Sequence, residues 1–183
     1  MKDSYLNACA EIAAVADALD LAQVETACRL IGNSGKIVLF GCGREGLQVQ
    51  GLAMRLHHLG LDATMQGAMN TPPLGPGDLF LTSAGPGELS TVTALMQTAK
   101  GAGADILFLT ARPDTPSAAL ADHILSVPAQ TMATDRSAPS STLPMGSLYE
   151  GALFVLFEVM VRRLAVLLAE TPETMRARHT NME

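Results

Sequence analysis

The sequence is short of charged residues and has no excess of basic ones. Asp, Glu, Lys and Arg make up 16% of its 183 residues, against roughly 25% in an average soluble protein. Twelve Lys and Arg stand against eighteen Asp and Glu, so the formal net charge is −6. Binding to nucleic acid or to an anionic membrane surface depends on clustered basic side chains. We therefore expect neither nucleic acid nor a membrane as a partner. The hydrophobic share of 48% also excludes a disordered chain.

The sequence also lacks an apolar run long enough to cross a bilayer. A spanning helix needs about 18 or more apolar residues in succession. The most apolar stretch, Ala152–Ala169, is interrupted by Glu158, Arg162 and Arg163. A mean hydropathy of +0.25 without a membrane span predicts apolar surface that another subunit covers. We expect a homodimer or a homotetramer.

Cysteines and histidines are few, and they lack the spacing of disulfide or metal sites. Cys9, Cys28 and Cys42 form no CxxC pair. The four histidines show no spacing typical of metal ligands. Asp3 and Glu11 interrupt the apolar residues near the start, so no secretory leader is predicted there. These features indicate a protein of the reducing cytoplasm without a bound metal.

What the sequence does contain is a regular alternation of short apolar runs with segments of helix length. Two amphipathic helical segments come first and end near Asn33. The runs IVLF, LFL and ILFL that follow are continuous, as expected of parallel strands covered on both faces. They predict an α/β fold, a three-layer sandwich with a five-stranded parallel sheet of the flavodoxin-like or Rossmann-like kind. The predicted strands are Lys36–Phe40, Asp62–Gln66, Asp78–Thr82, Asp105–Thr110 and His123–Val127.

Helices are predicted between these strands and after them. The last, Met145–Glu170, is apolar on nearly all sides, so we expect the sheet and a second subunit to bury it. The segment Pro128–Gly146 is longer than an ordinary connection and is either mobile or functional. We expect a single domain over 1–183, with N-terminal helices over 1–32, an α/β core over 33–170 and a tail over 171–183. The shorter predicted helices are Glu45–His58, Leu89–Gly101 and Ser117–Ala121.

Two of the loops that follow strands are rich in glycine, and ligands of open α/β sheets bind at that edge. The first, Gly41–Gly46, reads GCGREG and leads into a helix whose N-terminal N–H groups can hold an anion. The second, Thr82–Thr91, reads TSAGPGELST and adds hydroxyl groups. Gly41–Gly46 has the GxGxxG form of a dinucleotide site, but the second predicted strand ends at Gln66 and not at the acidic residue that such a site needs. Taken alone, each loop has a simpler structural explanation: in the second loop, Gly85 and Gly87 turn the chain and Ser90 or Thr91 caps the following helix.

Five motifs together resemble the sugar isomerase (SIS) domain and, within it, the 6-phospho-3-hexuloisomerases. They are GCGREG at 41–46, MRLHHLG at 54–60, TSAGPGELS at 82–90, MGSLYEGALF at 145–154 and ARHTNME at 177–183. The resemblance covers residues 21–183. It implies an enzyme that interconverts a 3-ketohexose 6-phosphate and fructose 6-phosphate without metal or cofactor, on a five-stranded parallel sheet, as dimers or tetramers.

The resemblance implies catalytic roles for three residues. Moving a carbonyl from C3 to C2 needs a base for the carbon-bound proton and a group that moves protons between the oxygens of a cis-enediol. Glu150 in GSLYE matches the family's base, and His58 in RLHHLG and His179 in RHTNME match its histidines, the latter on a tail that could reach a neighbouring subunit's site. Without the resemblance, Glu150 is interpreted as a solvated first-turn carboxylate favoured by the helix dipole, and His58 as a helix-terminal residue stabilised near the negative end of the dipole. The residues expected to bind the substrate are Gly43, Arg44, Glu45, Ser83, Gly85, Gly87, Glu88, Ser90 and Thr91.

Both glycine loops depart from the family pattern where a phosphate would be held. Family members read GxGRSG and SGSGET, whereas this sequence has Glu45 for the first serine, Pro86 for a later serine and Leu89 for the threonine. A carboxylate at position 45 would repel a phosphate by several kcal/mol at short range unless a cation such as Arg44 neutralises it. The expected activity is the isomerisation of 3-hexulose 6-phosphate to fructose 6-phosphate. Isomerisation of a non-phosphorylated sugar and a non-catalytic sugar-binding module are the alternatives.

Overall fold

The computed structural model describes residues 1–136 and 141–182, and five strands there form one parallel sheet in the order β2-β1-β3-β4-β5. Every strand boundary lies within one residue of the prediction, so the α/β class and the five-stranded parallel sheet are confirmed. The strands are β1 (Lys36–Gly41), β2 (Asp62–Met65), β3 (Leu79–Ser83), β4 (Asp105–Thr110) and β5 (His123–Ser126).

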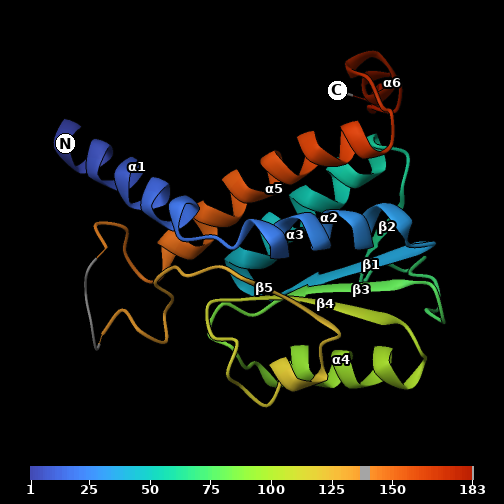
Figure 1. Ribbon diagram of the computed structural model, residues 1–183, viewed down its shortest axis with the longest axis horizontal. Coiled ribbons are helices and arrows are strands. Elements are labelled where there is room, and N and C mark those ends of the chain that lie inside the picture. Colours follow the sequence, from blue (N-terminus) through green and yellow to red (C-terminus); the bar gives the residue numbers. More distant parts are fainter. Residues whose placement is uncertain (137–140, 183) are drawn as a thin grey trace.

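Helices cover both faces of the sheet (Figure 1). On one face lie α1 (Lys2–Asp17), α2 (Leu21–Asn33), α3 (Gly43–His58) and α5 (Ser147–Leu167), with the short α6 (Pro172–Ala177) beside the far end of α3. On the other face lie α4 (Ser90–Gly101) and η1 (Ala118–Leu120). The segment predicted as a short helix over 117–121 is therefore a single 3-10 turn.

Each face of the sheet has its own core, which explains the continuous apolar runs. In β1, Ile37 and Leu39 belong to the larger cluster beneath α2, α3 and α5, whereas Val38 points into the smaller cluster beneath α4. Successive side chains of a strand point to opposite faces, so a strand covered twice has to be apolar at every position. Phe108 of β4, which is fully buried, anchors the smaller cluster.

Helix α5 is buried where it faces the sheet and the helices α1, α2 and α3, and is exposed on its remaining side. Leu153 and Leu164 are fully buried, whereas Phe154 is 60% exposed and Val159 54% exposed. Burial of α5 by the sheet is thus confirmed, and its burial by a second subunit stays a prediction. No helix in the part of the chain that the structure describes is long and apolar enough to cross a bilayer.

The N-terminal helix α1 packs against α5 and also holds the segment that leads into it. Glu11 accepts hydrogen bonds from Ser141 Oγ and from the backbone N–H of Thr142, the latter at 2.8 Å. Residues 137–140, in the middle of the long segment 128–146, lie outside the described residues.

Asp20 fixes the start of α2, because its carboxylate accepts a hydrogen bond from Ala22 N at 2.8 Å. Replacing it by alanine leaves an N–H of the first turn without this acceptor, and we expect Asp20→Ala to lower the free energy of unfolding by about 1 kcal/mol. Urea titration measures the loss. Asp17→Ala is the matched control, since the exposed Asp17 carboxylate accepts no hydrogen bond from any described residue. Equal midpoints for the two variants would contradict a stabilising cap.

Candidate active site

The loops after β1 and β3 meet the start of α5 around a pocket of about 330 Å³. The pocket lies at the carboxyl edge of the sheet, where the connections between strands and helices gather at the left of Figure 1. This is the edge at which open α/β sheets bind their ligands. The lining residues are Cys42, Gly43, Arg44, Glu45, Gly85, Pro86, Leu89, Thr131, Met132, Gly146, Tyr149 and Glu150.

Glu150 reaches this pocket from the first turn of α5. The helix starts directly after Gly146, whose φ of +74° suits glycine, and a Cβ there would lie 2.5 Å from the backbone nitrogen of Met132. The Glu150 side chain is only 18% exposed, so it is not the solvated surface carboxylate of the simpler interpretation. Its Oε2 lies 3.3 Å from Arg44 Nη2 and accepts no hydrogen bond from the described residues. Burial raises the pKa of Glu150, and Arg44 offsets part of that rise.

Arg44 ties the first turn of α3 to the beginning of α5. Its Nη1 donates to Ser147 Oγ at 2.7 Å, and its Nη2 donates to the carbonyl of Met145 at 2.6 Å. The same guanidinium faces Glu150. Arg44 therefore fixes the start of α5 relative to α3, and its positive charge partly offsets the negative charge of the Glu150 carboxylate.

Glu45 turns away from Arg44 and towards the loop after β3. Its Oε2 accepts hydrogen bonds from Ser83 Oγ at 2.7 Å and from Gly85 N at 3.0 Å. The residue is 8% exposed, and no ion pair among the described residues includes it. Burial raises the pKa of Glu45, and the hydrogen bonds from Ser83 and Gly85 lower it in part. Glu45 is thus a buried carboxylate that accepts hydrogen bonds from two donors and forms no ion pair with a described residue.

Tyr149 is a residue of the site that the sequence did not single out. It is buried, and its hydroxyl lies 3.1 Å from Ser83 Oγ, which links α5 to the same hydrogen-bonded group as Glu45. The signal was present, because a tyrosine in the first turn of an apolar helix needs a partner for its hydroxyl when it is buried. Thr131 and Met132, from the long segment before α5, also line the pocket and were not predicted.

Of the binding residues predicted in the second loop, Gly85 lines the pocket, and Ser83 contacts it through its hydrogen bond to Glu45. The other four lie outside the pocket lining. Glu88, Ser90 and Thr91 are exposed. The N-cap of α4 is Leu89 and makes no side-chain cap bond, so the alternative in which Ser90 or Thr91 caps the helix is wrong. Gly87, the fourth, turns the chain with a φ of +94°.

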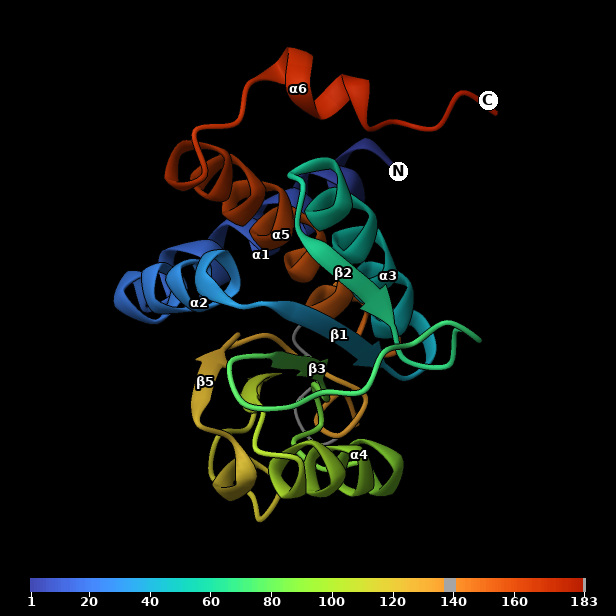
Figure 2. The same ribbon diagram turned by 90° about the vertical axis from the view of Figure 1, so that its right-hand side faces the viewer.

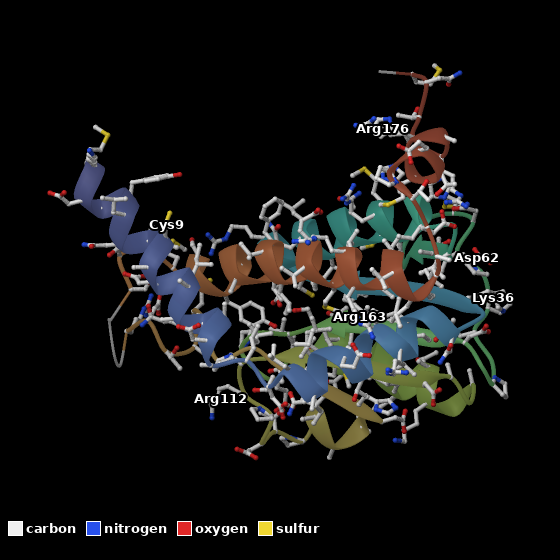
Figure 3. All side chains as sticks on the ribbon, turned by 45° about the horizontal axis from the view of Figure 1, so that its top comes forward. Cys9, Lys36, Asp62, Arg112, Arg163 and Arg176 are labelled. Carbon is white, nitrogen blue, oxygen red and sulfur yellow. The ribbon has the colours of Figure 1, made fainter. Side chains whose placement is uncertain are left out.

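The two predicted histidines lie at the opposite end of the molecule. His58 is the last residue of α3, and its buried ring stacks on that of His179 with centroids 5.1 Å apart. Arg178 donates to the carbonyl of His58 at 2.9 Å and so fastens the tail to the end of α3, where Figure 2 shows α6 and the C-terminal tail. An α-helix of 16 residues is about 24 Å long. Within one chain the structure therefore brings neither histidine to Glu150. Figure 3 shows the same separation, with Arg176 of α6 far from Arg112, which follows β4.

Burial of Glu45 should make the stability of the protein depend on pH. Because the folded chain raises the pKa of Glu45 above its ordinary value of 4.5, folding favours the protonated form. This contribution to stability is present below pH 4.5 and is lost as the pH rises through the folded-state pKa. Glu45→Gln keeps an acceptor for Ser83 and Gly85 but carries no charge. We expect it to raise the Tm by a few degrees at pH 8 and to leave it unchanged at pH 4, as measured by calorimetry. A variant that is less stable than wild type at pH 8 would contradict the prediction.

Comparison with known proteins places the chain among sugar isomerases. Residues 30–154 match the SIS domain family. A Mycobacterium gastri protein named 3-hexulose-6-phosphate isomerase is 38% identical over 173 residues, which are 94% of this chain and 86% of that protein. A Methanococcus jannaschii structure, described as inferring a molecular function of 3-hexulose-6-phosphate isomerase, has a TM-score of 0.79 at 23% identity and covers 88% of this chain and 86% of its own. The Vibrio vulnificus NanR protein, complexed with ManNAc-6P, has a TM-score of 0.77 at 19% identity, with 96% of this chain and 66% of that chain covered.

Proposed function

The chain belongs to the SIS domain family, and from this membership we propose that it interconverts 3-hexulose 6-phosphate and fructose 6-phosphate. The observation that supports this most is the state of Glu150. Its carboxylate is largely buried, faces the pocket and has an Oε2 that accepts no hydrogen bond from the described residues. A carboxylate of this kind is available to take a proton from a bound substrate.

We assign to Glu150 the transfer of the carbon-bound proton. In the 3-ketose, Glu150 takes the proton from C2, the electrons of that bond form the C2–C3 double bond, and the oxygen on C3 gains a proton to give the cis-enediol. Glu150 then returns its proton to C3, while the hydroxyl on C2 loses its proton and becomes the carbonyl. The raised pKa of Glu150 suits this role, because the carboxyl has to hold the proton between the two steps. Arg44, 3.3 Å from Glu150, is positioned to donate to the oxygens on which charge develops.

Incorporation of deuterium tests the activity. Fructose 6-phosphate incubated with the protein in D₂O should gain deuterium at C3 and convert in part to the 3-ketose, as followed by NMR. Proton exchange is the direct consequence of an enediol intermediate, so it appears even where the equilibrium favours one isomer. Binding of the sugar phosphate without exchange or conversion would instead favour the non-catalytic module.

A group that moves protons between the two oxygens is also needed, and His58 lies at the far end of α3, a helix about 24 Å long that begins at the pocket. We propose that a second copy of the chain brings the end of α3 and the tail, with His58 and His179, to the pocket of the first. The exposed apolar side of α5 supports such an assembly, since Phe154 and Val159 are available for burial.

Mixing two inactive variants tests this arrangement. Glu150→Gln and His58→Ala should each be inactive alone, and mixed oligomers should regain activity because some of their sites combine an intact Glu150 with an intact His58. Mixed oligomers that form but stay inactive would overturn the shared site.

A further inference from the structure

The carboxylate of Glu45 accepts hydrogen bonds from two buried donors at the pocket. The Ser83 hydroxyl at 2.7 Å and the Gly85 N–H at 3.0 Å both point to its Oε2. Ser83 is the last residue of β3 and Gly85 lies in the glycine loop that follows, at the edge where an anionic group of a ligand would bind. A carboxylate of the protein itself already takes up both donors.

The charges around this position are unfavourable to a second anion. Of the described residues that line the pocket, Arg44 is the only cation, and Glu45 and Glu150 are both carboxylates. The guanidinium of Arg44 is directed to Glu150, Met145 and Ser147 and not to Glu45. Two like charges a few ångströms apart repel each other strongly where protein partly excludes water. A phosphate dianion near Glu45 would meet this repulsion, and Arg44 would offset it only in part because its charge is already paired with Glu150.

A hydroxyl group fits the same position without that repulsion. Glu45 lines the pocket, and its Oε1 accepts no hydrogen bond from any described residue. An ionised carboxylate is an acceptor only, so a sugar hydroxyl that donates to Oε1 completes its hydrogen bonding. The subsite is therefore suited to the hydroxyl groups of a ketose more than to a phosphate.

We propose that Glu45 is a specificity-determining residue that cancels most of the contribution of a substrate's phosphate to binding. The chain then binds phosphorylated and unphosphorylated ketohexoses with similar affinity, and the substrate range of the proposed isomerase, on which this inference rests, extends to sugars without phosphate. Substituting Glu45 by an uncharged residue restores the preference for the phosphorylated sugar.

Calorimetric titration at pH 8 tests the proposal with fructose 6-phosphate, fructose and sulfate as ligands. For the wild type we expect the Kd values of the two sugars to lie within about tenfold of each other. In Glu45→Ser and Glu45→Gln, fructose 6-phosphate and sulfate should bind at least about tenfold more tightly, while the affinity for fructose stays the same or falls. Asp114→Asn is the matched control, because it removes an exposed negative charge on the loop after β4, outside the pocket lining.

Two results would overturn the proposal: a wild type that binds fructose 6-phosphate more than about a hundredfold more tightly than fructose, or Glu45 variants with unchanged Kd values for both anions. Glu45→Gln keeps both acceptor contacts, so the measurement stands even where Glu45→Ser does not fold. The binding data need no turnover. Failure of the proposed isomerase, seen as absent deuterium exchange, is therefore distinguishable from failure of the role of Glu45.

Discussion

Glu150→Gln lowers the turnover of fructose 6-phosphate about a thousandfold and leaves binding of the sugar nearly unchanged. A positioned general base contributes about 10² to 10⁴ in rate, and glutamine fills the same volume without the ability to take a proton. Because Glu150 is paired with a single cation at 3.3 Å, its loss releases Arg44 but breaks no hydrogen bond of the described residues. The measurement is kcat together with KM, which separates the loss of a proton acceptor from the loss of a binding group.

Glu158→Gln is the control for this substitution. Glu158 lies two turns further along α5, where it pairs with Arg55 at 3.0 Å on the surface. Its replacement removes the same charge from the same helix outside the pocket, and we expect turnover within about twofold of wild type. Retention of a tenth or more of wild-type turnover by Glu150→Gln would refute the assignment. Glu45, the other carboxylate of the pocket, would then be the group to test as base.

Gly46→Ala should destabilise the chain more than any other single change considered above, by about 3 kcal/mol. A Cβ on Gly46 would lie 2.4 Å from the carbonyl oxygen of Gly41 and 2.9 Å from its carbonyl carbon. The clash is with backbone atoms of β1, which cannot turn aside as a side chain could. In a chain of this length the loss corresponds to a fall in Tm of about 10 °C. Thermal unfolding followed by circular dichroism measures it.

Gly51→Ala, on the same helix, should raise the free energy of unfolding instead of lowering it. Gly51 of α3 is exposed, and a Cβ there meets nothing within 4 Å. Alanine should therefore stabilise by about 0.5 to 1 kcal/mol through helix propensity alone. If both alanine variants unfold at the wild-type temperature, the close approach of β1 and α3 does not limit stability.

The contact between Gly41 and Gly46 also shows what the sequence could predict. The GxGxxG spacing of a dinucleotide site includes a glycine that permits close packing of helix on strand, and here that packing is present around a pocket predicted to hold sugar. The strands were predictable to within one residue because apolar runs on a doubly covered sheet leave little choice of position. The location of the pocket followed from the same topology, since parallel strands bring their following loops to one edge.

The arrangement of side chains within the pocket was not predictable in the same way. Arg44 and Glu45 are neighbours in the sequence, yet one turns to α5 and the other to the loop after β3. That choice depends on which partners the tertiary structure offers, and periodicity carries no information about it. The distance of His58 from Glu150 could have been foreseen, because a helix that starts at one edge of a parallel sheet ends at the other. The position of His179 beside His58 could not, since it depends on a tail that returns to α3 after α6 and that Arg178 fastens to the carbonyl of His58.

Arg44 bonds to the carbonyl of Met145 and to Ser147, more than a hundred residues further along the chain. During synthesis on the ribosome, β1 and α3 emerge long before α5 is made. The nascent chain can form β1, β3 and their loops early, but the pocket stays incomplete until nearly all of the protein has left the exit tunnel. A sugar can therefore assist only the last stage of folding, when α5 docks on the sheet, and a chain released before residue 145 would lack the site.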